Sequence, residues 1–211
     1  MSSKVIGAML IIGPILLIGP WMLLGVDTSD MSPSESLAAI LADKTSVEMS
    51  GLLNIFGAMS MLTGLYFLVQ TLKSDNAVSN ACAEIGGLFL LLCVPIWVVM
   101  WGTEIAAIDA AGQFGNDVGA TIMATFTAFQ MSGILLVVGM LLLGISLTLL
   151  RKYKGIIGAL FVIASGLAFM DMIALVGSDA VAMIGWMGMF ATMLVTGILT
   201  TGILTTLQKK S

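Results

Sequence analysis

Long apolar runs follow one another along the chain, separated by short polar connections. Six of them reach the length of about 18 residues that a helix needs to cross the hydrocarbon layer of a membrane. They cover residues 5–25, 50–72, 83–106, 120–150, 154–177 and 181–207. We therefore predict an all-α fold, a polytopic bundle of six transmembrane helices, in which residues 1–211 form a single transmembrane domain.

The one long connection, between the first two runs, carries a helix signal of its own. Ser32 suits the position before a helix, Pro33 suits its first turn, and Glu35 completes a capping box with Ser32. Three apolar residues then share one face: Leu37, Ile40 and Leu41. We predict a short amphipathic helix on the outer membrane surface, which either covers the end of the bundle or serves as a docking element or lid.

Proline interrupts two of the apolar runs. The stretch IIGPILLIGPW holds Pro14 and Pro20, and Pro95 lies in the third run. Because proline removes a backbone donor and disturbs the carbonyl four residues earlier, we expect the first helix to be kinked or partly unwound. Broken helices line binding sites in many transporters, but proline is also common in membrane helices, so both interpretations stay open.

The composition agrees with a chain surrounded by membrane lipid. Hydrophobic residues make up 59% and charged residues only 9% of the 211 residues, against roughly a quarter charged in soluble domains. The first apolar run is too long for the core of a secretory signal, so we expect a retained helix. No part of the chain is left over for a soluble domain.

Basic residues are distributed unevenly between the two sides. Lys44 alone falls on the side that holds the first connection. The other seven fall at the termini and in the second and fourth connections: Lys4, Lys73, Arg151, Lys152, Lys154, Lys209 and Lys210. Because basic residues mark the cytoplasmic side, we predict that both termini are cytoplasmic. Acidic residues gather in the outer connections, where they concentrate cations or are simply solvated.

Several kinds of chemistry lack their usual residues. The chain has no histidine, which removes imidazole bases, the usual zinc sites and Ser-His-Asp triads. Its 17 methionines raise the question of copper(I), but pairs such as Met170 and Met172 are spaced by two and face apart on a helix. Cys82 and Cys93 lie about 16 Å apart on one predicted helix and cannot pair. We expect no enzyme activity, cofactor, metal site or nucleic-acid partner.

Four spans each carry a strong polar group at a similar depth: Asn54, Glu104, Gln130 and Asp171. At about 1.5 Å per residue, Asp171 lies about 25 Å from the cytoplasmic anchor Lys154. A lone charge in lipid is costly, so we expect Asp171 to point into the bundle and to bind one of the other three or Thr127, or to be protonated. Whether this layer is functional or structural stays open.

Small residues support that orientation of Asp171. Ala164 and Ala168 lie two turns and one turn before it on the same helical face, a surface that suits close packing against another helix. Further glycines at helix-packing positions indicate a tight bundle: Gly133, Gly139, Gly144, Gly158, Gly166, Gly185 and Gly188.

Two other surfaces are candidates for binding. Trp97, Trp101 and Glu104 share a face at i, i+4 and i+7, and form either a cage for a small cation or an aromatic belt with an interfacial acid. The tail TGILTTGILTT suits close approach of a further helix, within this chain or in a partner. Its candidate lateral-packing residues are Gly197, Thr200, Thr201 and Ile203.

The stretch GMLLLGISLTLLRKYKGIIGALFVIASGLAFMD resembles the fourth and fifth helices of an uncharacterised family of six-helix integral membrane proteins. The shared features are Gly139, Gly144, Lys154, Gly158, Gly166 and Asp171, and the first outer connection running into SGLLNIFGAM is also similar. This chain has Tyr153-Lys154 where the family tends to have a proline-arginine turn, and its two Gly-Pro pairs are not typical. The resemblance covers about 150 residues and implies a fold, not an activity.

Two functions remain. The short connections, the missing cofactor ligands and the small-residue faces favour a non-enzymatic accessory or structural subunit that packs with other membrane protein subunits. The prolines of the first span, the acidic outer side and the polar layer favour a small cation- or proton-coupled transporter or channel. Residues 1–106 and 107–211 show no convincing internal repeat that would strengthen the second function.

Overall fold

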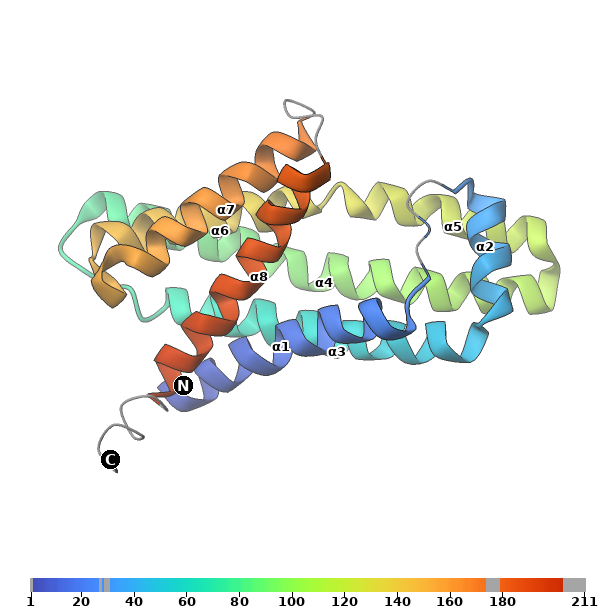
Figure 1. The fold of residues 1–211 in the computed structure, drawn as a ribbon, viewed down its shortest axis with the longest axis horizontal. Helices are drawn as coiled ribbons and strands as arrows, with labels where there is room; N and C mark the ends of the chain where they lie inside the picture. The colour runs from blue at the N-terminus through green and yellow to red at the C-terminus, as the bar shows by residue number, and fades with distance from the viewer. Residues whose placement is uncertain (1, 27, 29–30, 174–178, 203–211) are drawn as a thin grey trace. The chain divides into compact units, whose positions relative to one another are not determined.

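The computed structural model describes residues 2–26, 28, 31–173 and 179–202, apart from the side chains of Thr127, Gln130 and Asp179. Figure 1 shows its helices. In chain order these are α1 (Ser3–Leu24), α2 (Pro33–Ala42), α3 (Lys44–Val69), α4 (Ala77–Phe114), α5 (Asn116–Gln130), α6 (Gly133–Leu149), the 3-10 turn η1 (Lys152–Gly155), α7 (Ile156–Met172) and α8 (Asp179–Thr201). The predicted all-α class is confirmed, since the described residues contain no strand.

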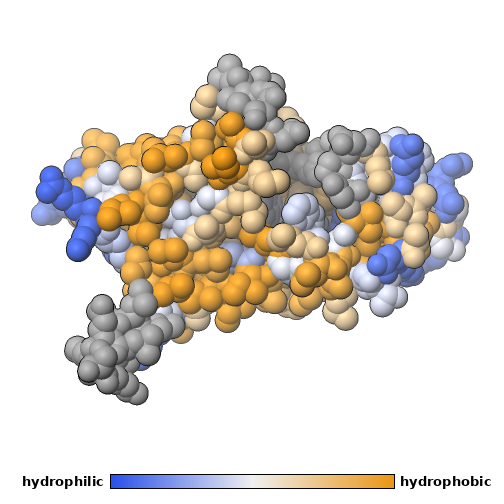
Figure 2. Space-filling model, viewed as in Figure 1, coloured by the Kyte–Doolittle hydropathy of each residue, from blue (hydrophilic) through white to orange (hydrophobic). Residues whose placement is uncertain are grey.

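Five segments are long and apolar enough to cross a membrane: α1, α3, α4, the segment Lys152–Met172, and residues Ala180–Thr201 of α8. They agree with an integral membrane protein, and large apolar side chains cover much of the face shown in Figure 2. The count of six spans is not confirmed. The apolar run 120–150 is divided between α5, with 15 residues, and α6, with 17.

The division of that run has a local cause. Met131 and Ser132 form a turn, in which the amide and the hydroxyl of Ser132 both donate to the Phe129 carbonyl, at 3.0 and 2.6 Å. These bonds reach back three residues, whereas a continuing α-helix bonds four residues back. Gly133 then begins a new helix. The similar depth predicted for Gln130 assumed one unbroken helix over residues 120–150, and the structure has two helices there instead.

The third apolar run differs in the other direction. Instead of ending at residue 106, α4 continues for 38 residues to Phe114, a length of about 57 Å at 1.5 Å per residue. Gly115, with φ at 98°, then turns the chain directly into α5. Residues with a side chain rarely adopt this φ. Glycine therefore permits a tight helix-to-helix turn where a longer outer loop was expected.

The prolines do not unwind the first helix. α1 is helical from Ser3 to Leu24 through both Pro14 and Pro20, so the helix is not unwound there, while the alternative of a kink stays a prediction; α4 likewise contains Pro95. Isolated prolines are tolerated in membrane helices when neighbouring groups satisfy the freed carbonyls.

Contacts divide the chain into two compact units. Unit 1 consists of residues 1–14, 60–93 and 133–211, and unit 2 of residues 15–59 and 94–132. The division falls directly after Pro14, close to Pro95, and at the turn between α5 and α6. The helices α1, α3 and α4 each contribute one segment to each unit.

Unit 1 is built on helices that approach each other at glycine. A Cβ atom added to Gly144 of α6 would lie 2.9 Å from the Gly158 carbonyl of α7, and one added to Gly86 of α4 would lie 2.9 Å from the Gly139 carbonyl of α6. Real Cβ contacts are not this short, so these helices can reach their observed separation only with glycine at those positions. The tight packing expected from the glycine pattern is confirmed at Gly139, Gly144, Gly158 and Gly185. Gly133 has only ordinary van der Waals neighbours, and Gly166 has open space around it.

The connection from α6 to α7 holds basic residues in a strained backbone. Arg151, Tyr153 and Lys154 have φ values of 50°, 53° and 60°, in the left-handed region that favours glycine. Side-chain hydrogen bonds hold the turn in unit 1: the Tyr153 hydroxyl pairs with the Thr200 hydroxyl at 2.7 Å, and Lys152 Nζ donates to Thr71 Oγ1 at 2.9 Å.

Unit 2 has a core of its own, formed by α2, α5 and the segments of α3 and α4 that belong to it. The core comprises Leu37, Ile40, Val47, Met100, Ala107, Ile108, Met123 and Phe126. The predicted capping box at the start of α2 is confirmed, because the Glu35 amide donates to Ser32 Oγ at 3.4 Å and the Ser32 amide donates to Glu35 Oε2 at 2.9 Å. The apolar face of α2 thus packs on the helices of unit 2.

The close packing at glycine in unit 1 can be tested by adding a single methyl group through a glycine-to-alanine substitution. Gly144→Ala should lower the free energy of unfolding by about 1–3 kcal/mol, because the new Cβ meets the backbone of α7. Gly166→Ala is the matched control: it adds the same group where nothing lies within 4 Å, and it should be neutral or stabilise by up to about 1 kcal/mol through helix propensity. SDS-induced unfolding in micelles measures both, and equal effects would contradict the packing described.

Candidate functional site

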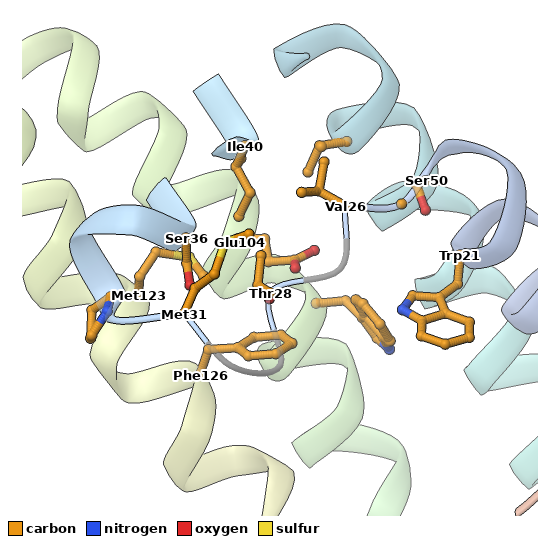
Figure 3. Close-up of a pocket in the computed structure, with 14 residues that line it drawn as sticks. Trp21, Val26, Thr28, Met31, Ser36, Ile40, Ser50, Glu104, Met123 and Phe126 are labelled. Carbon is orange, nitrogen blue, oxygen red and sulfur yellow. The ribbon is translucent and has the colours of Figure 1, made fainter. Parts of the chain in front are cut away.

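Unit 2 contains a cavity of about 230 Å³ that combines a carboxylate, hydroxyl groups and aromatic rings. Figure 3 shows the residues that line it. α4 contributes Trp101 and Glu104, α5 contributes Met123 and Phe126, α2 contributes Ser36 and Ile40, α3 contributes Val47 and Ser50, and Trp21 lies near the end of α1. Segments from five helices, distant in sequence, therefore meet around one small space.

Among the described residues that line the cavity, Glu104 is the only charged one. Its side chain is only partly exposed and lies among the other lining residues in Figure 3. Within the described part of the chain, no ion pair or hydrogen bond to the Glu104 side chain is formed. The described residues thus hold a carboxylate at the cavity without supplying a group of opposite charge.

Aromatic rings enclose the space beside this carboxylate. The rings of Trp101 and Phe126 pack edge to face, with centroids 5.9 Å apart and planes inclined at 66°, and both line the cavity. Trp21 lines a further part of the cavity. The indole nitrogen of Trp101 is buried and has no hydrogen-bond partner among the described residues. No hydrogen bond to Glu104 or to a described backbone carbonyl therefore holds the ring in place.

The capping box of α2 positions the side of the cavity that Ser36 and Ile40 form. Two hydrogen bonds hold the pKa of Glu35 below its usual value: the Ser32 hydroxyl makes the larger contribution and the Ser32 amide the smaller one. Because this pKa is depressed, the stabilisation is complete above the ordinary glutamate pKa and is lost as the pH falls through the lowered value. At neutral pH the start of α2 is therefore fixed, and Ser36 follows within its first turn.

Of the three residues predicted to form a cation cage on α4, two line the cavity. Trp101 and Glu104 line the same cavity, whereas Trp97, one turn earlier on α4, does not line it. Trp97 is buried in unit 2, with an indole nitrogen that has no partner among the described residues. Trp21 and Phe126, from α1 and α5, contribute aromatic surface in its place.

Asn54, a member of the expected polar layer, lies behind the cavity. It is buried on α3, and its amide nitrogen donates to the Ser50 hydroxyl, which lines the cavity, at 3.4 Å. The amide oxygen of Asn54 has no partner among the described residues. Asn54 and Glu104 therefore both belong to unit 2, and Ser50 lies between Asn54 and the cavity.

Asp171 occupies the last turn of α7 in unit 1 and is partly exposed. The helix face predicted to pack is confirmed, because Ala164 and Ala168 are buried and Gly185 of α8 comes so close that a Cβ there would lie 2.6 Å from the Ala168 nitrogen. A hydrogen bond of Asp171 to Asn54, Glu104, Gln130 or Thr127 stays a prediction. The first two belong to unit 2, and the side chains of the other two lie outside the described residues.

The small-residue face of α8 is occupied within the chain. A Cβ added to Gly197 would lie 2.8 Å from the Gly7 carbonyl of α1, and one added to Gly7 would meet the side chain of Thr201. Thr200 bonds the Tyr153 hydroxyl. Of the two possibilities left open for this face, the structure thus shows packing within the chain at these three residues, while Ile203 lies outside the described residues.

The sequence analysis missed Ser36, Ser50 and Phe126. The face of α2 was identified from its apolar residues alone, although Ser36 lies one turn before Ile40 and shares its side of the helix. Ser50 and Phe126 carry no motif. Their role in the cavity depends on contacts between separate helices, which a pattern within one helix does not reveal.

Comparisons with protein-family models, with curated proteins and with solved structures find no match to this chain.

Asp171 offers a test that separates a structural polar group from a transport site. In a purely structural role, Asp171→Asn should keep the fold at a cost of about 1 kcal/mol, a typical value for a hydrogen bond between helices in lipid. In a transport role, the same change should abolish pH- or cation-dependent flux into liposomes. Asp75→Asn, the same charge change at an exposed residue between α3 and α4, is the control. If both variants keep full stability and flux, Asp171 has neither role.

Proposed function

We propose that this chain is a non-enzymatic integral membrane protein that works as an accessory or structural subunit of a larger membrane assembly. The glycine-packed helices of unit 1 carry the proposal. Reciprocal close approaches join α6 to α7 and α1 to α8, so this unit is suited to a fixed framework. Its described connections are short, which leaves the apolar helix faces as the main surface available to other subunits.

The outer faces of α7 and α8 are the surfaces we assign to such contacts. Ile163 of α7 is 60% exposed and Ile184 of α8 is 61% exposed. Lipid covers such side chains by default, and a partner helix can replace the lipid without loss of apolar contact, because membrane helices associate through packing rather than through hydrophobic transfer.

A photocrosslinking amino acid at position 163 tests this subunit role. In native membranes it should form an adduct with a different membrane protein, and gentle extraction should yield a particle heavier than the 22.0 kDa chain by that protein's mass. The same amino acid at Phe161, which is fully buried on α7, is the control and should crosslink only within the chain. A single chain surrounded by lipid, with no adduct from position 163 or 184, would refute the proposal.

We propose that both termini are cytoplasmic. Seven basic residues support this orientation, because they lie at the termini and in the second and fourth connections predicted from the sequence. Cysteines placed at Ala38 and Asp75, both exposed, should then react differently with an impermeant maleimide. In a background without Cys82 and Cys93, position 38 should react in intact cells and position 75 only after permeabilisation. Equal reactivity of the two positions would contradict this orientation.

The second candidate is a small cation- or proton-coupled transporter or channel. One observation in unit 2 favours it: Glu104 lies on an apolar helix and lines a cavity, and its carboxylate has no ion pair or hydrogen bond among the described residues. Ionisable groups in membrane segments commonly mark ion or substrate pathways. The flux measurement on Asp171→Asn, repeated with Glu104→Gln, separates this candidate from the subunit role, since a subunit without transport activity gives no flux for either variant to remove.

A further inference from the structure

The cavity of unit 2 presents a charge that its own residues do not balance. Among the described residues that line it, Glu104 has the only ionisable side chain, and these residues give its carboxylate no ion pair or hydrogen bond. An isolated carboxylate in an apolar environment is costly, and a bound cation would offset that cost. The first requirement of a ligand is therefore a positive charge.

The aromatic residues that line the cavity favour an organic cation over an inorganic one. Trp101 and Phe126 are inclined at 66° with centroids 5.9 Å apart, and Trp21 lines the same cavity. Ring faces attract cations within about 6 Å, tryptophan most strongly, and cages of aromatic rings with nearby acids are the usual receptors for alkylated ammonium groups. Their apolar surface also suits the carbon atoms that such a ligand carries.

The oxygen ligands argue against a divalent metal ion. Calcium takes about six to eight oxygen ligands and magnesium demands near-ideal octahedral geometry. Here one carboxylate is accompanied by the hydroxyls of Thr28, Ser36 and Ser50, and Ser50 already accepts a hydrogen bond from Asn54. In the part of the chain that the structure describes, no group of three or more acidic or cysteine residues is close enough to hold a metal.

The volume limits the size of the ligand. At about 230 Å³, the cavity is below the range of roughly 300–1,000 Å³ that drug-sized ligands occupy. Ser36 and Ile40 of α2 form one side, and the capping box fixes the helix that carries them. A cation with a few carbon atoms fits these limits, whereas a long-chain amine does not.

We propose that the unit 2 cavity is a binding site for a small monovalent organic ammonium ion, with Glu104 as its counter-charge and Trp21, Trp101 and Phe126 as its aromatic cage. This site goes beyond the subunit role. Binding at the cavity requires neither a partner protein nor transport across the membrane.

The test uses the full chain in lipid nanodiscs, with tetramethylammonium chloride as the probe and tryptophan fluorescence as the readout. Titration should give a saturable change. Glu104→Gln, which keeps the shape of the side chain and removes its charge, should weaken binding at least tenfold. Phe126→Leu should weaken it about threefold or more, in line with the loss of one cation–π contact.

Asp109→Asn is the matched control for charge. Asp109 lies on the same helix, is exposed, and does not line the cavity, so this variant should bind tetramethylammonium as the unchanged chain does. Circular dichroism confirms that each variant is folded. Sodium chloride at equal ionic strength should give no saturable change, and tetrabutylammonium should bind more weakly than tetramethylammonium because of its size.

Three results would overturn the proposal: no saturable change with tetramethylammonium, equal effects of Glu104→Gln and Asp109→Asn, or an equal response to sodium. The last would identify an alkali-cation site or a plain salt effect. These outcomes are independent of the subunit role, because crosslinking at position 163 in unit 1 reports on partner proteins whether or not the cavity of unit 2 binds a cation.

Discussion

Hydrocarbon offers polar groups no hydrogen-bond partner, and this constraint governs most of the structure. The backbone meets it by forming helices. Side-chain hydroxyls meet it by returning to their own helix: Thr192, Thr196 and Thr200 donate to the carbonyls of Gly188, Thr192 and Thr196, each at 2.7 Å. Between helices, Ser79 and Ser146 pair with each other in a buried contact at 2.9 Å. Glu104 differs from these groups, because its carboxylate has no hydrogen-bond partner among the described residues.

Since lipid is as apolar as the side chains, helices gain stability from close packing. Glycine at facing positions makes that possible in unit 1, and it also explains why the small-residue face of α8 is not free for another protein. The backbone of Gly197 already lies against Gly7 of α1. Any partner of unit 1 therefore meets larger apolar side chains, such as Ile163 and Ile184.

Local signals in the sequence were sufficient for much of the fold. The capping box of Ser32 and Glu35 depends on residues three apart, and the packing face of Ala164 and Ala168 depends on helical spacing, so both could be predicted. Hydropathy alone did not predict the turn at Met131 and Ser132, because the surrounding residues are apolar on both sides. It also did not predict the length of α4, since the turn depends on one glycine conformation at Gly115.

The candidate site was predictable only where it lies on one helix. Trp101 and Glu104 share a face of α4 by spacing, whereas the contributions of Trp21, Ser36, Ser50 and Phe126 depend on how separate helices meet. Proline was a misleading signal for α1, because a membrane helix can retain its form when other groups satisfy the freed carbonyls. Charge patterns suggested where acids gather, but not which acid lines a cavity.

The central claim is that the protein leaves the Glu104 carboxylate to be balanced by a ligand. Infrared difference spectroscopy of the chain in nanodiscs, recorded on addition of tetramethylammonium, tests it most directly because carboxylate stretching bands respond to a nearby charge. The account predicts a shift in these bands that is present in the unchanged chain and missing in Glu104→Gln. Identical difference spectra for the two proteins would contradict it.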